Sequence, residues 1–187
     1  MFILASQSPR RQRLMKEDII NDFKVVVSDV DETVDPFISP IEAVQIIAKR
    51  KGDKIHRMYP KDVVISADTI VVINNTIIGK PKDKEDAKRI LHLLSDKEHE
   101  VITAYCIYHD DKFIENIVKS HVFFEKLDDK LIDDYIASGS PMDKAGAYGM
   151  QDNEKFHIVK SYRGSKKNII GFPSDEILLD LKREKLL

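Results

Sequence analysis

The chain carries the sequence VVISADT at residues 63–69, a run of apolar and β-branched residues that ends in an acid and a threonine. Residues 63–67 predict a buried β-strand, because β-branched side chains pack well on a pleated surface. Asp68 follows at the expected end of this strand, where open α/β sheets place their ligands. A carboxylate here can serve as a general base or a magnesium ligand, and an ordinary turn or cap aspartate is the alternative.

On both sides of this strand the apolar spacing alternates between the periods of strands and helices, which is typical of an α/β protein. Ser39 and Glu42 form a capping-box pattern that predicts the start of a helix, and Lys51 lies on the apolar stripe of that helix. We expect a single domain over residues 1–187. Further strands are expected at 2–5, 23–28, 71–73, 76–78, 100–108, 113–124, 156–160 and 168–170, with 71–73 and 76–78 forming a hairpin around Asn74 and Asn75. Further helices are expected at 9–18, from Asp83, around 131–136 and at the C-terminal end. The helix after Asp83 should face inward with Ala87, Ile90, Leu91 and Leu94, and the helix around 131–136 is marked by Leu131, Ile132, Tyr135 and Ile136.

The composition is that of a globular protein, with 42% hydrophobic and 33% charged residues among 187. The net charge of −2 argues against a nucleic-acid coat protein or a membrane-surface binder, both of which need a basic excess. Cys106 is the single cysteine, so no disulfide can form within the chain. No apolar run approaches the length of a membrane span or of a signal-peptide core. We therefore expect a cytoplasmic protein.

Two basic segments are candidates for phosphate binding. The run SQSPRR at residues 6–11 follows an expected strand and opens a helix, which concentrates backbone N–H groups, hydroxyls and guanidinium groups. A helix cap with solvated arginines is the alternative. Lys80 stands between a glycine and a proline, where it can hold a phosphate or belong to an ordinary turn. Lys51 can point into a cleft or extend to water from the end of its helix stripe.

An acidic stretch, DVDETVD at residues 29–35, invites two further interpretations. A calcium loop is excluded, because Val34 and Pro40 stand where such a loop needs glycine and glutamate. Together with the preceding valines, the stretch resembles the strand-then-DxDxT nucleophile motif of haloacid-dehalogenase-type phosphatases. That hypothesis is disfavoured, because no late acidic metal motif follows a strand. An exposed acidic loop is the third interpretation.

The remaining residues limit the cofactor. The six histidines show no metal-ligand spacing, and no Walker loop, Rossmann glycine fingerprint or nucleophile elbow is present. Any metal is therefore expected to be oxygen-ligated, as Mg²⁺ or Mn²⁺ is. Taken together, the candidate residues indicate a polyphosphate ligand bound by Arg and Lys, with carboxylates for metal and water.

The order of these motifs resembles the Maf family. The resemblance is carried by LASQSPRR at 4–11, DE at 31–32, AKRK at 48–51, ADTIV at 67–71, GKP at 79–81, DKAGAYGMQ at 143–151 and GFP at 171–173. These blocks span nearly the whole chain in the family's order.

The resemblance implies an α/β fold with an elongated mixed sheet flanked by helices and two lobes around a central cleft, similar to inosine triphosphate pyrophosphatases. It implies an enzyme that hydrolyses a nucleoside triphosphate to the monophosphate and pyrophosphate with a divalent cation, Mg²⁺ or Mn²⁺. A homodimer without nucleic-acid or membrane partners is expected, with a role in nucleotide-pool housekeeping and a link to cell-division arrest.

Residue roles follow from the same resemblance. Asp68 corresponds to the proton acceptor that activates water and is expected to be a metal ligand as well, and Glu32 helps to hold the metal or the water. Lys51 and Lys80 contact the phosphates, and Ser8 and Arg10 bind the triphosphate. Arg11, Thr69 and Gln151 are likewise expected to bind the substrate, and their combination resembles the branch acting on dTTP and UTP. A glutamine amide can pair with the imide edge of thymine or uracil.

The chain departs from the family pattern at Asp152, where glycine usually follows the glutamine, which can alter the loop beside the base. Smaller departures are Asp96 and the pair Lys166-Lys167. A non-catalytic nucleotide-binding or cell-division protein remains a further hypothesis, and retention of the acids and lysines above argues against it.

Overall fold

The protein is a mixed α/β structure, which a computed structural model describes from Met1 to Leu187. The strands are β1 (Phe2–Leu4), β2 (Phe23–Val25), β3 (Val63–Ile73), β4 (Thr76–Ile78), β5 (Glu98–His109), β6 (Lys112–Phe124) and β7 (Val159–Arg163). The helices are α1 (Pro9–Leu14), α2 (Pro40–Met58), α3 (Lys84–Leu94), α4 (Asp129–Ala137), α5 (Asn153–Phe156), α6 (Lys166–Ile170) and α7 (Ser174–Arg183).

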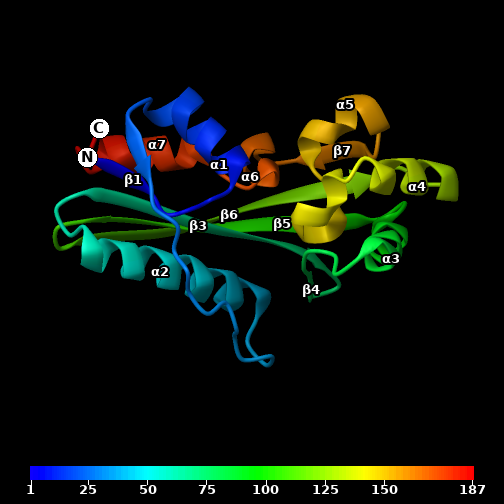
Figure 1. The fold of residues 1–187 in the computed structure, drawn as a ribbon, viewed down its shortest axis with the longest axis horizontal. Helices are drawn as coiled ribbons and strands as arrows, with labels where there is room; N and C mark the ends of the chain where they lie inside the picture. Colours follow the sequence, from blue (N-terminus) through cyan, green and yellow to red (C-terminus); the bar gives the residue numbers. More distant parts are fainter. The chain divides into compact units, whose positions relative to one another are not determined.

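All seven strands belong to one sheet with the order β2-β1-β3-β5-β6-β7, and β4 pairs with β3 beside this path. β1 is parallel to both of its neighbours, whereas β3–β4 and β6–β7 are antiparallel. The mixed sheet with flanking helices confirms the predicted fold class (Figure 1). None of the helices has the length and apolar character needed to cross a lipid bilayer.

The chain divides into two compact units. Unit 1 contains residues 1–69, 103–118 and 171–187, and unit 2 contains residues 70–102 and 119–170. Strands β3, β5 and β6 contribute residues to both units. The single domain expected from the sequence stays a prediction.

In unit 1, helix α2 lies on one face of the sheet, and α1 and α7 lie on the other face (Figure 1). Helix α2 begins where the capping box predicts, since the Ser39 hydroxyl accepts the Glu42 N–H at 3.2 Å and the Glu42 carboxylate accepts the Ser39 N–H at 2.9 Å. The expected stripe of Val44, Ile47 and Ala48 is buried against the sheet. The local pattern therefore sets both the start and the orientation of this helix.

Helix α2 approaches the sheet closely at Gly52. A Cβ atom on this glycine would lie 2.6 Å from the Ser66 hydroxyl and would also overlap the ring of Tyr108. The Ser66 hydroxyl donates to the carbonyl oxygen of Ala48 at 2.8 Å, which joins β3 directly to α2. Since Lys51 precedes Gly52, this close packing holds Lys51 over the middle of β3.

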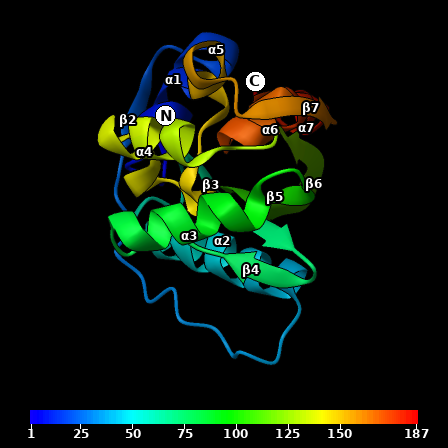
Figure 2. The ribbon, with the colours of Figure 1, turned by 90° about the vertical axis from the view of Figure 1, so that its right-hand side faces the viewer.

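In unit 2, helices α3 and α4 lie side by side (Figure 2). Asp83 accepts the Asp86 N–H at 2.8 Å and caps α3, as the sequence predicts. The predicted inward residues of α3 are all buried, and the core of the unit includes Ala87, Ile90, Leu91, Leu94, Phe124, Tyr135 and Tyr148.

The region after Ala67 differs from the sequence-based expectation. β3 does not stop there but runs on through residues 68–73, so Asp68 lies inside the strand and not at its end. Asp68 and Thr69 are part-buried and interrupt an otherwise buried run of residues. The strand predicted from the apolar spacing therefore ends before them, although the observed strand continues. The predicted hairpin around Asn74 and Asn75 is confirmed, with both residues at positive φ, as a tight hairpin turn requires.

Residues 168–170 form the end of helix α6, so the strand predicted there is wrong. The Ser165 hydroxyl accepts the Asn168 N–H at 3.1 Å, which favours a helical turn. The buried Asn168 side chain then donates to the carbonyl oxygen of Val101 at 3.0 Å. The strands expected at 23–28 and 156–160 are observed as the shorter β2 and the later β7.

Buried His99 makes a pH-dependent stability prediction for unit 2. Its Nε2 lies 2.8 Å from the Tyr148 hydroxyl, and burial lowers the pKa of His99 from 6.5 to about 3. Below about pH 6.5, His99 therefore takes up a proton in the unfolded chain but not in the folded chain. The free energy of unfolding then falls by about 1.4 kcal/mol for each unit by which the pH decreases. Between about pH 7 and pH 5 we expect His99 to contribute a loss of about 2 kcal/mol.

Urea unfolding at both pH values checks this, with His99→Gln expected to lack that part of the loss. His157→Gln, which replaces an exposed histidine by the same residue, serves as the matched control for the substitution itself. Equal pH dependence in the parent and His99→Gln would contradict the prediction.

Candidate active site

Three residues of the predicted site meet in unit 1. The ammonium nitrogen of Lys51 lies 2.7 Å from a carboxylate oxygen of Asp68 and 2.8 Å from one of Glu32. The Lys51 and Asp68 side chains are 12% and 13% exposed, whereas that of Glu32 is 58% exposed. The cluster thus joins a sheltered ion pair to an acid that faces solvent, which lets a polar ligand reach its charges.

The segment that carries Glu32 has no regular structure and is extended between β2 and α2 (Figure 2). Helix α2 fastens it, since Arg50 donates to the carbonyl oxygens of Asp31 and Thr33 at 3.0 and 2.6 Å. Lys54 donates to the carbonyl oxygen of Asp29. These backbone bonds place Glu32 beside Lys51.

The same segment does not support the phosphatase hypothesis. Strand β2 ends at Val25, so Asp29 does not directly follow a strand as the DxDxT motif requires. Asp31 instead accepts the backbone N–H of Thr33 at 2.8 Å, which closes a local turn. Hydrogen bonds from the Thr33 side chain and then from its backbone N–H lower the pKa of Asp31. The acidic stretch is thus an exposed loop that supplies one acid, Glu32, to the cluster.

Arg11 lies next to this cluster, and its side chain forms hydrogen bonds with other residues of unit 1. Its guanidinium group donates to the carbonyl oxygens of Ala67 at 2.7 Å and Gly171 at 2.8 Å, and to the Thr69 hydroxyl at 3.1 Å. The Thr69 hydroxyl also lies 2.9 Å from that of Thr103. Arg11 therefore holds the residues on either side of Asp68.

The Arg11 guanidinium interacts electrostatically with the acids of the cluster. Burial lowers the pKa of the Arg11 guanidinium, while the negative charge of Asp68 acts in the opposite direction. Arg10 lowers that pKa further and Glu32 raises it. Two cations and two carboxylates thus influence one another within unit 1, as a site for a charged ligand requires.

Ser8 stands immediately before α1, at the position from which a side chain would cap the helix. Its hydroxyl makes no capping hydrogen bond, although its carbonyl oxygen accepts the Gln12 N–H at 3.0 Å. Arg10 follows in the first turn of α1. The structure thus confirms the predicted strand–turn–helix context of these residues, and their role in phosphate binding stays a prediction.

Lys80 and Gln151 belong to unit 2. The Gly146 N–H donates to the carbonyl oxygen of Gly79 at 3.1 Å, so the segment that carries Lys80 is joined to the glycine-rich loop that carries Gln151. Lys80 is exposed. Gly146 has a φ of 71°, and a Cβ there would lie 2.9 Å from Val71, so this junction requires glycine.

Gln151 has an unusual environment for an amide. Its Oε1 is buried and has no hydrogen-bond donor within the protein. A Cβ on Gly149 would lie 2.7 Å from its Nε2, so the side chain packs against the backbone of that glycine. A buried acceptor without a donor is unfavourable, and an N–H group of a ligand would relieve it.

A buried polar network beside Gln151 was not singled out by sequence reasoning. Asp152 accepts the hydroxyls of Tyr135 at 2.6 Å and Ser140 at 2.7 Å, and buried Lys144 donates to the Ser140 hydroxyl at 3.0 Å. The sequence predicts Tyr135 only as one of the apolar residues that mark its helix. The one signal in the sequence was the departure from the family's glycine at Asp152.

The carboxylates of Glu32 and Asp68 fit an oxygen-ligated cation. Both bind the same ammonium group, so their oxygens already surround a positive charge, and carboxylate oxygens suit Mg²⁺ or Mn²⁺. No group of three or more His, Cys, Asp and Glu side chains gathers as a metal site. Two protein carboxylates with remaining positions for phosphate oxygens and water is a usual arrangement for Mg²⁺ with nucleotides.

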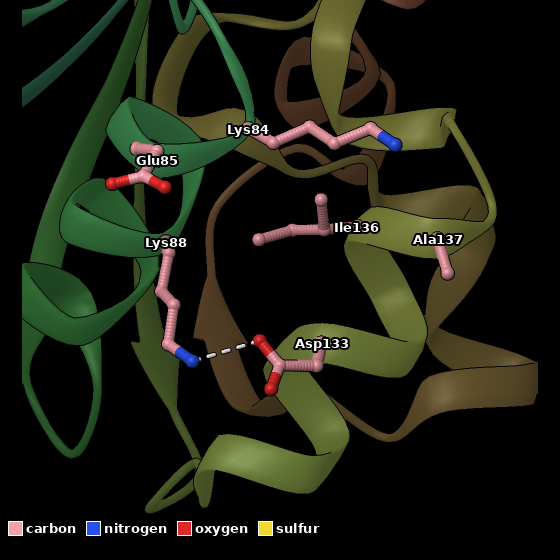
Figure 3. Close-up of a pocket in the computed structure, with 6 residues that line it drawn as sticks. All are labelled: Lys84, Glu85, Lys88, Asp133, Ile136 and Ala137. Carbon is pink, nitrogen blue, oxygen red and sulfur yellow. Dashed lines mark hydrogen bonds and ion pairs between the residues drawn. The ribbon is translucent and has the colours of Figure 1, made fainter.

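A separate hollow lies between α3 and α4 in unit 2, and an ion pair of 2.8 Å between Lys88 and Asp133 crosses it (Figure 3). None of the residues with a predicted role lines it. The lining residues are Lys84, Glu85, Lys88, Asp133, Ile136 and Ala137.

The mixed sheet with flanking helices places the chain in the α/β class, and unit 1 carries a charged cluster of two acids and one lysine. The family model described as Maf-like protein matches residues 1–184, so the chain belongs to the Maf-like family. The resemblance found in the motifs is thereby confirmed.

Curated relatives match over nearly the full chain. A protein of Geobacillus sp. (strain WCH70), named dTTP/UTP pyrophosphatase, is 41% identical over 182 residues, which cover 97% of each chain. A protein of Thermococcus gammatolerans with the same name is 41% identical over 177 residues, which cover 95% of this chain and 93% of the relative. Among solved structures, the Staphylococcus aureus Ham1 protein has a similar fold, with a TM-score of 0.54, 14% identity and 98% coverage of both chains.

Proposed function

We propose that the protein hydrolyses dTTP and UTP to the nucleoside monophosphate and pyrophosphate. The names of the relatives, at about 40% identity across the family domain, support this activity. The observation that carries the proposal is the cluster in which Asp68 and Glu32 share the ammonium group of Lys51. It combines a base, a cation and oxygen ligands, which are the groups that hydrolysis of a phosphoric anhydride needs.

In the proposed reaction Asp68 accepts a proton from a water molecule. The water oxygen forms a bond to the α-phosphorus, and the bond between that phosphorus and the bridging oxygen to the β-phosphate breaks. Pyrophosphate leaves with the electron pair of that bond. Lys51 stabilises the negative charge that develops on the phosphate oxygens, and it orients Asp68 through the ion pair of 2.7 Å.

Glu32 and Asp68 would hold a divalent cation, Mg²⁺ or Mn²⁺. When bound, such a cation offsets the negative charge of the triphosphate and makes its phosphorus more open to attack. Glu32, which is exposed, provides the accessible oxygen, and Asp68 the sheltered one.

We assign the remaining predicted residues to substrate binding. Ser8 and Arg10 would bind the triphosphate near the start of α1, and Lys80 would contact phosphate oxygens. Arg11 and Thr69 would also contribute to substrate binding, and their hydrogen bonds support the strand that carries Asp68. The buried Oε1 of Gln151 would accept the N3–H of thymine or uracil, while its Nε2 donates to a neighbouring carbonyl of the base.

Pyrophosphate release tests the proposal. The purified full chain is incubated with Mg²⁺ or Mn²⁺ and, in turn, dTTP, UTP, CTP, GTP and 7-methyl-GTP, and pyrophosphate and free phosphate are measured separately. We expect pyrophosphate from dTTP and UTP at rates at least about 10-fold above those for the other nucleotides, because one well-placed hydrogen-bonding group discriminates by at least that much.

Other outcomes would contradict specific parts. Turnover of 7-methyl-GTP alone would contradict the role of Gln151. Free phosphate without pyrophosphate would favour a phosphatase, and nucleotide binding without turnover would favour the non-catalytic hypothesis. The homodimer, the role in nucleotide-pool housekeeping and the link to cell-division arrest stay predictions of the resemblance, and the cytoplasmic location stays a prediction from the composition of the chain.

A further inference from the structure

We propose that Asp152 is a positioning residue for base recognition, holding the turn that presents Gln151 to the pyrimidine. This inference deepens the proposed function and rests on it. It concerns a network wholly within unit 2, formed by side chains of α4 and of the segment 140–152.

The hydroxyl of Tyr135 is the centre of this network. It donates to Oδ2 of Asp152 at 2.6 Å and accepts the backbone N–H of Gly149 at 3.1 Å. The N–H of Asp152 in turn donates to the carbonyl oxygen of Gly149 at 3.0 Å. Gln151 lies between these two residues, so both ends of its turn are tied to one phenol group on α4.

A second set of hydrogen bonds involves the same oxygen, Oδ2 of Asp152. The Ser140 hydroxyl donates to Oδ2 of Asp152 at 2.7 Å. Lys144, only 7% exposed, donates to the Ser140 hydroxyl at 3.0 Å and to its carbonyl oxygen at 2.5 Å. Lys144 also forms an ion pair of 2.7 Å with Asp143. The carboxylate thus receives two hydroxyl donors, and a buried cation supports one of them.

These contacts fix the backbone turn against which the Gln151 side chain packs. Its amide packs on the backbone of Gly149, where a Cβ would come within 2.7 Å of Nε2, and its Oε1 is buried without a donor. A free turn would let this amide rotate toward a donor or toward water, because an unpaired buried acceptor is unfavourable. By holding the turn, Asp152 keeps the Gln151 amide packed on Gly149, with its acceptor left for the base.

The Tyr135 hydroxyl is held in its protonated form. Burial raises the pKa of Tyr135 above its usual value, and the hydrogen bond and charge of Asp152 raise it further. The phenol therefore keeps its proton at neutral pH and remains a donor to Asp152. A glycine at position 152 would offer no acceptor to either hydroxyl, so the role belongs to the aspartate.

Steady-state kinetics of the full chain test the inference. We expect Asp152→Ala to raise KM for dTTP and UTP about 10-fold with kcat within about 2-fold, because a misplaced binding group weakens binding without removing the reacting groups. The ratio of kcat/KM for dTTP to that for CTP should fall about 10-fold. Asp152→Asn should restore both values to within about 3-fold of the parent, because one amide oxygen can accept both hydroxyls.

Asp134→Ala is the matched control, since it removes an exposed carboxylate of α4 that pairs with Lys130 at 2.6 Å. It should leave KM and the dTTP to CTP ratio unchanged. Tyr135→Phe provides a second test that remains informative where Asp152→Ala does not fold, and it should shift KM and the ratio in the same direction.

The outcomes separate this inference from the proposed function. If the parent protein releases no pyrophosphate, the proposed function fails. If the parent is active but both variants keep its KM and base preference, Asp152 does not position Gln151. A fall in kcat alone, with the base preference intact, would likewise overturn the inference, because it would indicate a general structural effect.

Discussion

Replacing Asp68 by asparagine is expected to lower kcat for pyrophosphate release about 10³-fold, which is the usual contribution of a positioned general base. Asparagine keeps the size of the side chain but cannot accept a proton from water at neutral pH. Lys51 keeps its ion pair of 2.8 Å with Glu32, so the variant should fold like the parent. Pyrophosphate release at saturating dTTP with Mg²⁺, together with thermal unfolding, measures both effects.

Asp62→Asn is the control for Asp68→Asn, because it removes a carboxylate of the same unit that pairs with the N-terminal amine at 2.9 Å. Its kcat should match that of the parent. An Asp68→Asn variant that retains full kcat would show that another group activates the water.

Replacing Arg11 by lysine is expected to lower the free energy of unfolding by about 2–3 kcal/mol and kcat/KM by about 10- to 100-fold. The guanidinium group donates to three acceptors in different directions, and a single ammonium group cannot reproduce that geometry. Two of those acceptors belong to Ala67 and Thr69, so their loss would displace the intervening Asp68. Urea unfolding and dTTP kinetics measure the two effects.

Arg13→Lys provides the comparison, since Arg13 is exposed and its contact with Glu17 is 3.9 Å long. Its free energy of unfolding should stay within about 0.5 kcal/mol of the parent, as for other surface pairs. If Arg11→Lys behaves like Arg13→Lys, the hydrogen bonds of Arg11 do not stabilise unit 1.

Several elements could be predicted from the sequence because their signals are local. The capping box of Ser39 and Glu42 marks the start of α2, and the hydrophobic spacing after Asp83 gives the buried face of α3. The two adjacent asparagines predict the hairpin between β3 and β4. In each case the residues that carry the signal are a few positions apart, so the chain itself brings them together.

Two predictions from the sequence were wrong, one of a strand and one of the end of a strand, because contacts with residues far away in the chain determine the structure there. Residues 168–170 were expected to form a strand, yet they end helix α6. The side-chain amide of Asn168 donates to the carbonyl oxygen of Val101 in β5. Asp68 interrupts an apolar run, yet β3 continues past it. The backbone of β3 pairs with β1 before Asp68 and with β4 after it. Local composition cannot report either contact, since the partner lies far away in the chain.

The order of motifs along the chain was enough to indicate the family and to select Glu32, Lys51 and Asp68 as a chemical group. That Lys51 contacts both acids depended on the packing of α2 at Gly52 and on the backbone bonds of the Glu32 segment. The hydrogen bond between Tyr135 and Asp152 joins residues 17 positions apart, and it became visible only in the folded chain. Periodicity and motifs report which side chains are buried or reactive, whereas the partner of each polar group depends on which segments the fold brings within hydrogen-bond distance.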